Sequence, residues 1–288
     1  MLQEIAIIGA GGKMGSWFAN YFSIRSAQVS VYDTNEDSVK ALVGNYRMSP
    51  TLADCVPTAD IVIVCVPVQL TPKVIAQCVK EMKNGAVIAE ISSVKHKTFP
   101  ALAKVRSNVH PLCIHPMFGP GAGEKNQLKM LLVPVRDQEA EAKRLREMFD
   151  GLMLTVLPNA KAHDEAIAVV LGLTYFVNIA FAKTISRSDI ELLKQISGTT
   201  FGLQSMLAES ILTDDPELMS ALVRDNPFAA KQINRYIEEA SSIAKLASKK
   251  KGRYFEAEIL KVKKRLQMRQ DLQESYKRLY DMVQVHNG

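Results

Sequence analysis

The first half of the chain alternates between short apolar runs and segments of helical period. Apolar runs typical of buried strands lie at residues 3–8, 28–32, 60–66, 86–91, 109–114, 129–135 and 152–157. Amphipathic segments between them predict helices at residues 16–25, 70–82, 97–106 and 139–149. Strands that alternate with helices pair in parallel, because each helix carries the chain back across the sheet. The pattern therefore predicts an α/β fold, a doubly wound parallel sheet covered by helices.

The pattern changes after Pro158, where helical segments follow one another and no strand pattern returns. These segments lie at residues 163–185, 189–207, 216–224, 227–248 and 253–283. We therefore predict a first domain over residues 1–158 and an all-α helical domain over residues 159–288. The helix at 163–185 is apolar nearly all round, which indicates burial in a larger core. We hypothesise that this core is a subunit interface, so that the chain forms a homodimer through its helical domain.

Length and composition fit an ordinary globular protein of about two domains. The chain has 288 residues, of which 47% are apolar and 23% charged. No apolar run approaches the roughly 20 residues that span a bilayer, so we expect no membrane contact and a cytoplasmic location. The four cysteines have no CxxC spacing. They are expected to be reduced structural thiols, with no metal site.

The net charge of +6 raises the question of nucleic-acid binding. Much of the excess lies between residues 245 and 269, where acidic residues are interspersed with the basic ones. Such a run is typical of a solvated helix face, and no stacking motif or recognition helix accompanies it. We expect no nucleic-acid partner and favour a small anionic substrate.

A glycine-rich turn follows the first strand and precedes the first helix. It consists of Gly9, Ala10, Gly11, Gly12, Lys13, Met14 and Gly15. Glycines in this position allow a tight turn and let backbone N–H groups approach a pyrophosphate, whose charge the helix N-terminus favours. The turn does not follow the plain GxGxxG pattern, because position 14 is Met; it follows GxxGxxG instead. It indicates a dinucleotide-binding domain of the Rossmann type.

Asp33 strengthens this interpretation, because it ends the second predicted strand about 20 residues after the turn. A carboxylate there accepts hydrogen bonds from the adenosine ribose and repels a 2′-phosphate. No arginine follows in Thr34-Asn35-Glu36, so we predict NAD rather than NADP. The alternative is that Asp33 only caps the helix that starts near Asn35.

Several candidate site residues follow strands that end at one edge of the sheet, which is where ligands bind in open α/β folds. We assign cofactor contacts to Val66, Pro67 and Ser92, and catalytic roles to Ser93 and His115. A neutral imidazole beside a substrate hydroxyl can take its proton while hydride leaves the adjacent carbon. The alternatives are that His115 is a structural histidine at a turn and that Ser93 caps the next helix.

Five segments together resemble the prephenate dehydrogenases, over nearly the whole chain. They are Lys13-Met14-Gly15 in the glycine turn, Ser93-Val94-Lys95, the six residues from His115 to Pro120, His163-Asp164, and Gly172-Leu173-Thr174. The resemblance implies NAD-dependent oxidative decarboxylation of prephenate to 4-hydroxyphenylpyruvate in tyrosine biosynthesis. It also implies that His115 accepts the proton of the ring hydroxyl and that Ser93 orients that hydroxyl and the imidazole.

The helical domain departs from the family pattern where the substrate is expected. A histidine usual in the family is Tyr175 here, and the arginine that binds the substrate carboxylate would fall near Ser210. Serine cannot replace a bidentate arginine. Either another cation takes over, for which the candidates are Lys95, Arg224 and Arg235, or the substrate differs.

These departures leave alternatives open. The chain could use arogenate, act on another small hydroxy acid, or be a catalytically silent NAD-binding regulatory protein. Retention of both Ser93 and His115 speaks against the last of these.

Overall fold

The structure is a computed structural model of the chain, and it describes residues 3–25, 27–123, 127–248 and 252–286. Residues 249–251 of the predicted basic segment lie outside this description. By its packing, the described chain divides into two compact units. The sheet unit comprises Met1–Gly172 and Asp215–Ala229, and the helical unit comprises Leu173–Asp214 and Ala230–Gly288. The domain boundary that the sequence pattern places after residue 158 stays a prediction.

Eight strands form one sheet in the described part of the chain. They are β1 (Glu4–Ile8), β2 (Gln28–Tyr32), β3 (Arg47–Met48), β4 (Ile61–Val64), β5 (Val87–Glu90), β6 (His110–Pro116), β7 (Lys129–Val133) and β8 (Met153–Val156). Their order in the sheet is β3-β2-β1-β4-β5-β6-β7-β8. The predicted α/β fold is confirmed. Strand β3 was not predicted, because two residues are too few to show a strand pattern in the sequence.

The sheet is parallel from β3 to β6, whereas β7 pairs antiparallel with β6 and parallel with β8. The prediction of a wholly parallel sheet is therefore wrong for the last two strands, β7 and β8. The reason lies in the connection at residues 117–128, whose described part contains no helix. Without a crossover helix the chain turns back beside β6, and the two strands pair antiparallel.

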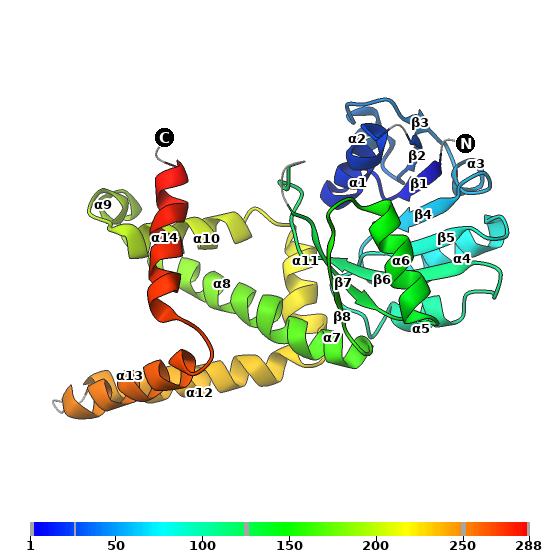
Figure 1. Cartoon of the computed structure of the whole chain (residues 1–288). Coiled ribbons are helices and arrows are strands. Elements are labelled where there is room, and N and C mark those ends of the chain that lie inside the picture. The colour runs from blue at the N-terminus through cyan, green and yellow to red at the C-terminus, as the bar shows by residue number, and fades with distance from the viewer. Residues whose placement is uncertain (1–2, 26, 124–126, 249–251, 287–288) are drawn as a thin grey trace. The chain divides into compact units, whose positions relative to one another are not determined.

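Helices cover both faces of the sheet, as can be followed in Figure 1. The helices of this part are α1 (Lys13–Ser23), α2 (Glu36–Lys40), α3 (Leu52–Cys55), α4 (Thr71–Glu81), α5 (Phe99–Ala103) and α6 (Gln138–Met148). Phe18 of α1 and Leu145 of α6 are buried in one core, while Ile75 of α4 and Leu102 of α5 are buried in the other. Strand residues such as Val62 and Ile63 alternate between the two cores, as the period of a strand requires.

The carboxyl ends of β1, β4, β5 and β6 meet at one edge, because these neighbouring strands are parallel. The chain leaves β1 toward β2 on one side, while β4 lies on the other side of β1. In open α/β sheets this reversal of strand order opens a crevice at the carboxyl edge. The glycine turn, Ser93 and His115 all follow strands that end there.

Beyond β8 the described chain is helical. The elements are α7 (Ala160–Ile167), η1 (Ala168–Leu173), α8 (Thr174–Ile185), α9 (Ile190–Gln195), α10 (Thr199–Ile211), α11 (Pro216–Ser220), η2 (Ala221–Asp225), α12 (Ala229–Ser248), α13 (Gly252–Gln267) and α14 (Leu272–His286), of which η1 and η2 are π-helical. This confirms the predicted helical second part. By packing, α7, α11 and η2 belong to the sheet unit.

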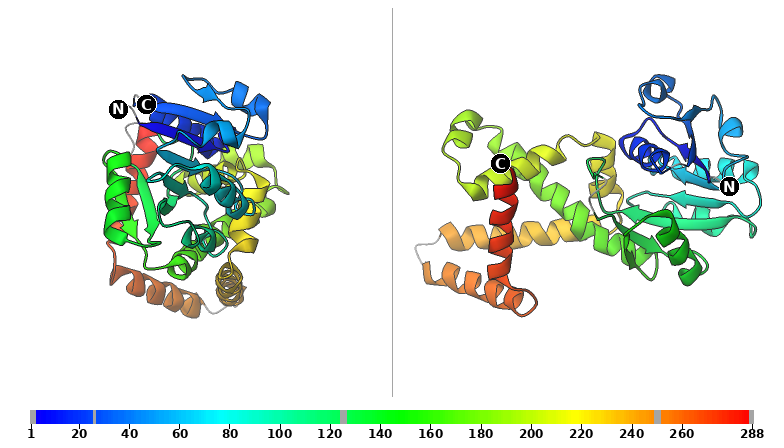
Figure 2. Two further views of the ribbon diagram at one scale, coloured as in Figure 1. Left: turned by 90° about the vertical axis from the view of Figure 1, so that its right-hand side faces the viewer. Right: turned by 45° about the horizontal axis from the view of Figure 1, so that its top comes forward.

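The helical unit leaves many apolar side chains exposed. Within it α8 packs against α10, where the rings of Phe181 and Phe201 lie 6.1 Å apart. Figure 2 shows α12 and α13 as long separate rods. Their exposed apolar residues include Ile237, Ile243, Ile259 and Leu260.

The continuous helix Ala160–Ile185 corrects one expectation, because by length and composition it is long and apolar enough to cross a membrane. Only 22% of its most apolar stretch is buried. The core or interface helix of a globular protein passes the same test, so this finding alone does not place the helix in a bilayer.

Candidate functional site

The glycine turn folds so tightly that an added Cβ would lie within 3 Å of another atom at three of its positions, one of them Gly11, where it would lie 2.5 Å from the Cβ of Ser38. Gly9 has a φ of +86°, and a Cβ there would lie 2.6 Å from the carbonyl oxygen of Cys65. A Cβ on Gly15 would lie 2.0 Å from the carbonyl oxygen of Gly9. The first turn of α1 therefore packs directly on the end of β1, with backbone in place of side chains.

Asp33 is tied to this turn rather than to the next helix. Its Oδ2 accepts a hydrogen bond from the backbone N–H of Gly11 at 3.0 Å, and its Oδ1 accepts one from the N–H of Asn35 at 3.0 Å. The cap of α2 is Asn35, whose side chain accepts from the N–H of Ser38. The structure thus gives the capping role to Asn35 and places the Asp33 carboxylate beside the glycine turn, where a ribose would bind.

The other predicted cofactor contacts lie around the same edge. Lys13 and Met14 begin α1, with Lys13 exposed and Met14 half-buried. Val66 and Pro67 follow β4, and their carbonyl oxygens accept hydrogen bonds from the hydroxyl of Thr71 at 3.3 and 3.1 Å. That hydroxyl lies 3.2 Å from the Oγ of Ser92, after β5. The ends of β4 and β5 are thereby linked at the candidate cofactor site.

His115 is buried near the end of β6, with 4% of its surface exposed. Its Nδ1 lies 3.0 Å from the Nε2 of His163, and the Nδ1 of His163 lies 2.8 Å from the Oδ1 of Asp164. His163 and Asp164 are fully buried on α7. Burial, followed by the neighbouring His163 and Lys95, lowers the pKa of His115 well below its usual 6.5. At neutral pH the imidazole is uncharged and able to accept a proton.

Lys95 does not face an open site. Its Nζ lies 2.6 Å from the Oε1 of Glu90 and 2.5 Å from the carbonyl oxygen of Ile114, and both charged side chains are fully buried. The Sγ of Cys113 also donates to Glu90, at 3.1 Å. Lys95, which the sequence analysis proposes as a ligand of the substrate carboxylate, is therefore already paired with Glu90 inside the protein.

Ser93 is half-buried between the buried residues Ser92 and Val94. The helix that follows, α5, has Thr98 at its N-cap position, so Ser93 does not cap it. Within the described residues its hydroxyl makes no hydrogen bond to protein. This leaves the hydroxyl available to a ligand at the carboxyl edge of β5.

The segment 215–229 packs over this edge. Val68, Val94 and Ala221 form a small buried cluster, and the Nδ2 of Asn226 donates to the backbone oxygen of Asp164 at 2.9 Å. Asp225 accepts from the side chain of Gln69 at 3.0 Å and lies 3.5 Å from the Nζ of Lys97. Arg224 is thereby held at the same edge, with 75% of its side chain exposed and its Nε 3.1 Å from the Oδ1 of Asp225.

The remaining candidate substrate residues belong to the helical unit. The hydroxyl of Tyr175 donates to the Oδ2 of Asp214 at 2.6 Å; burial, followed by this carboxylate, raises the pKa of Tyr175. Arg235 is exposed on α12. Ser210 is exposed on α10, and its hydroxyl donates to the carbonyl oxygen of Leu207. Ser93 and His115 belong to the sheet unit instead, and the substrate roles of Tyr175, Arg235 and Ser210 stay predictions.

Sequence reasoning assigned no chemical role to His163, Asp164 or Glu90. A signal was present for each: two adjacent ionisable residues open an apolar helix, and Glu90 is a lone carboxylate in an apolar strand. Their hydrogen-bond and ion-pair partners could not be identified from the sequence. Among the described residues, no group of three or more His, Cys, Asp and Glu side chains could hold a metal ion.

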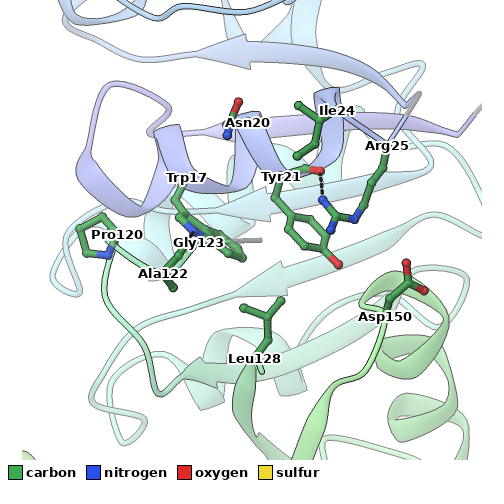
Figure 3. Close-up of a pocket in the computed structure, with 10 residues that line it drawn as sticks. All are labelled: Trp17, Asn20, Tyr21, Ile24, Arg25, Pro120, Ala122, Gly123, Leu128 and Asp150. Carbon is green, nitrogen blue, oxygen red and sulfur yellow. Dashed lines mark hydrogen bonds between the residues drawn. The ribbon is translucent and has the colours of Figure 1, made fainter. Parts of the chain in front are cut away.

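A separate cavity of about 180 Å³ lies between α1 and the chain that follows β6 (Figure 3). Its lining includes Trp17, Tyr21, Arg25, Ala122 and Asp150. The Nε1 of Trp17 donates to the carbonyl oxygen of Ala122 at 2.8 Å, and the Trp17 ring lies 4.6 Å from that of Phe118. These contacts anchor the segment after His115 on the helix that follows the glycine turn.

Two family models match consecutive parts of the chain. The model of the prephenate dehydrogenase nucleotide-binding domain matches residues 22–152, and that of the prephenate dehydrogenase dimerization domain matches residues 159–262. The chain belongs to the prephenate dehydrogenase family. The glycine turn precedes the first matched residue, so its agreement with the family rests on its own residues and geometry.

Curated members of the prephenate dehydrogenase family resemble the chain at low identity. A probable arogenate/prephenate dehydrogenase of Methanocaldococcus jannaschii is 24% identical over 85% of this chain and 57% of its own length. The T-protein of Enterobacter agglomerans is 25% identical over 82% of this chain and 60% of its own length. The chain thus spans less than two thirds of either relative.

Solved structures of the family share the fold. Prephenate dehydrogenase from Aquifex aeolicus, in complex with hydroxyphenyl propionate and NAD+, has a TM-score of 0.71 at 20% identity and covers 93% of this chain and 99% of its own. Arogenate dehydrogenase from Synechocystis has a TM-score of 0.67 at 18% identity and covers 92% and 99%.

Proposed function

We propose that the chain is an NAD-dependent dehydrogenase that converts prephenate to 4-hydroxyphenylpyruvate and carbon dioxide, as a cytoplasmic step of tyrosine biosynthesis. The observation that carries the proposal is the buried, uncharged His115 near the end of β6, on the sheet edge where the glycine turn follows β1. Family membership supports the reaction class.

The residues around the turn fit a dinucleotide. Gly9 and Gly15 admit no Cβ, so the start of α1 packs closely on the end of β1, and no acidic residue in the first turn of α1 opposes the charge of a pyrophosphate there. Asp33 would bind the ribose hydroxyls and repel a 2′-phosphate. Bound NAD would supply the hydride acceptor. The Aquifex aeolicus relative, whose structure contains NAD+, supports this choice.

In the proposed reaction His115 accepts the proton of the ring hydroxyl as hydride leaves the same ring carbon. Loss of carbon dioxide then returns a bonding electron pair to the ring, which becomes aromatic, and the oxygen regains the proton from His115. Ser93 orients the hydroxyl from the end of β5. The proton returns to the oxygen from which it came, so the substrate loses only hydride and carbon dioxide.

Arg224 is the best-placed candidate for the substrate carboxylates. It belongs to the sheet unit and is exposed, whereas Lys95 is paired with Glu90. Tyr175 and Ser210 replace the polar groups usual in the family. That departure favours a second candidate function, oxidation of arogenate or another small hydroxy acid by the same residues.

We also propose that the protein is a homodimer. The match to a dimerization domain and the exposed apolar side chains of α12 and α13 support it. Light scattering at working concentration tests this point, and a mass of 31.9 kDa, that of one chain, would contradict it.

The test of the function is the appearance of reduced nicotinamide when the purified chain and NAD receive prephenate, then arogenate, with NADP as the cofactor control. Turnover with prephenate supports the proposal. Normal NAD binding without turnover on either compound would reject it, and the search would move to other hydroxy acids. A catalytically silent regulatory protein would bind NAD and turn over none of these compounds.

A further inference from the structure

Three buried side chains form a hydrogen-bonded row that ends on His115. The Nδ1 of His115 lies 3.0 Å from the Nε2 of His163, whose Nδ1 lies 2.8 Å from the Oδ1 of Asp164. The exposed fractions of the three are 4%, 0% and 0%. The row uses one nitrogen of His115 and leaves the other, Nε2, outside it.

The hydrogens of this row can be placed from its far end. Asp164 accepts from the backbone N–H groups of Lys95 and His96 at 2.8 and 2.9 Å. Burial raises the pKa of Asp164, but hydrogen bonds from His163 and from these two N–H groups outweigh burial and hold that pKa below its usual 3.8. Asp164 is therefore a carboxylate, which only accepts.

Since Asp164 only accepts, the Nδ1 of His163 carries a hydrogen. Burial is the largest cause that lowers the pKa of His163, against the Asp164 hydrogen bond, which raises it, so the ring is neutral and its Nε2 has a lone pair. The Nδ1 of His115 must then donate to that lone pair. In a neutral imidazole the remaining nitrogen, Nε2 of His115, is the acceptor.

We propose that His163 and Asp164 are positioning residues that hold His115 in the tautomer with its lone pair on Nε2, the form able to take a proton from the substrate. The proposal rests on the proposed function only for the source of that proton. The tautomer itself is a property of the protein without substrate.

The surrounding charges make Asp164 the group that compensates a proton on His115. The titratable and charged groups around the row are Lys95, Glu90, Cys113 and His96, besides its own members. Lys95 and Glu90 form an ion pair at 2.6 Å, so the Glu90 carboxylate is already engaged, and the Cys113 thiol, whose pKa burial raises, is uncharged. The row therefore connects His115 through His163 to the carboxylate of Asp164, whose other oxygen lies 3.2 Å from the Nδ1 of the partly exposed His96. A hydrogen bond from Asn226 to the backbone oxygen of Asp164 fixes the start of α7 beside it.

The direct test is nitrogen-15 NMR of the imidazoles in the full-length protein without substrate. The chain has five histidines, so the His115 signals can be assigned by difference from single variants. We expect the Nδ1 of His115 to resonate as a protonated nitrogen and its Nε2 as an unprotonated one. The opposite assignment, with the hydrogen on Nε2, would overturn the proposal whatever substrate the enzyme uses.

Two substitutions at His163 separate positioning from mere structure. Glutamine in H163Q offers an oxygen that can accept from the Nδ1 of His115, whereas leucine in H163L offers none. We expect H163L to lower kcat on the order of 10- to 100-fold, with the KM for NAD changed less than about twofold, and H163Q to recover most of that loss. The control is H110Q, since His110 has no place in the row; its kcat should equal that of the unmodified protein.

The spectra and the kinetics must agree. In H163L the two His115 nitrogens should move toward an average of the protonated and unprotonated positions, and in H163Q they should not. Equal loss of kcat in both variants with an unchanged His115 tautomer would overturn the proposal and assign His163 a packing role. If the tautomer moves as expected but no variant, nor the original chain, oxidises prephenate or arogenate, the proposed function fails and the positioning role stands.

Discussion

The sheet unit and the helical unit differ in how their ionisable side chains are paired and how their apolar side chains are buried. In the sheet unit several ionisable groups near the candidate site are buried and paired: Lys95 with Glu90, and Asp164 with His163 and two backbone N–H groups. In the helical unit large apolar side chains remain exposed, including Ile196 at 69% and Leu260 at 64%. The sheet unit pairs these ionisable groups within itself, and the helical unit presents apolar faces typical of surfaces that another chain covers.

This difference separates the two parts of the functional question. The groups proposed to orient the substrate hydroxyl and take its proton, Ser93 and His115, lie in the sheet unit. Two of the positions where the sequence departs from the family, Tyr175 and Ser210, lie in the other unit. The reaction type is therefore better supported than the identity of the substrate.

The largest expected effect tests whether the sheet unit alone carries the chemistry. His115→Asn should lower kcat on the order of 10²- to 10⁴-fold, because the substitution removes the proton acceptor. NAD binding, measured by fluorescence titration, should change little, since His115 is not among the glycine-turn residues. Unchanged turnover in this variant would assign the base to another residue.

The next prediction sharpens the contrast between buried and exposed pairs. Lys95→Met leaves the Glu90 carboxylate buried without its cation and should lower the free energy of unfolding by about 3–5 kcal/mol. The matched control is Lys83→Met, because Lys83 pairs with Asp60 at 2.7 Å while both side chains are over 40% exposed. That variant should lose no more than about 1 kcal/mol in the same urea titration. Equal losses would show that burial does not set the strength of the first pair.

Two arginine variants test which unit supplies the cation that binds the substrate carboxylates. Arg224→Gln should raise the KM for prephenate about tenfold, the equivalent of about 1.4 kcal/mol from a charged hydrogen bond. Arg235→Gln, in the helical unit, should leave KM nearly unchanged. The reverse result would move the carboxylate site to the helical unit.

Asp33→Ser should have a smaller effect, confined to the cofactor. Loss of the carboxylate removes its repulsion of a 2′-phosphate and a hydrogen-bond acceptor for the ribose, so the ratio of kcat/KM for NAD to that for NADP should fall several-fold. The kcat with NAD at saturation should stay the same. An unchanged ratio would mean that Asp33 serves only to brace Gly11 and Asn35.

The smallest expected effect is that of pH on kcat/KM over the usual assay range. The pKa of His115 is lowered well below 6.5, mainly by burial, so the base stays uncharged as the pH falls through 6.5, and kcat/KM should keep its plateau there. Activity is lost only as the pH approaches the lowered pKa. The unfolded chain binds these protons near pH 6.5, so stability should already decline between that pH and the lowered values of His115 and His163. A kcat/KM profile with its midpoint at 6.5 would show that His115 is exposed to water.

Local pattern determined much of the fold and the composition of the site. Apolar runs and helical periods predicted all the described strands except the two-residue β3, and the helical second part, because burial of one face imposes a short-range period on the sequence. The glycine turn and His115 were predicted at strand ends, where the structure has them. These features depend on neighbouring residues, so the sequence displays them directly.

The tertiary structure decided how the polar residues are paired. His115 meets His163 across 48 residues, and the N–H of Lys95 meets Asp164 across 69. The reversal of β7 and the burial of Lys95 against Glu90 arise in the same way, from elements packed together after the chain has crossed the sheet. No local period records such contacts, because their geometry depends on the arrangement of whole strands and helices. The sequence by itself determined which chemical groups reach the sheet edge, and only the packing decided which lone pair His115 offers.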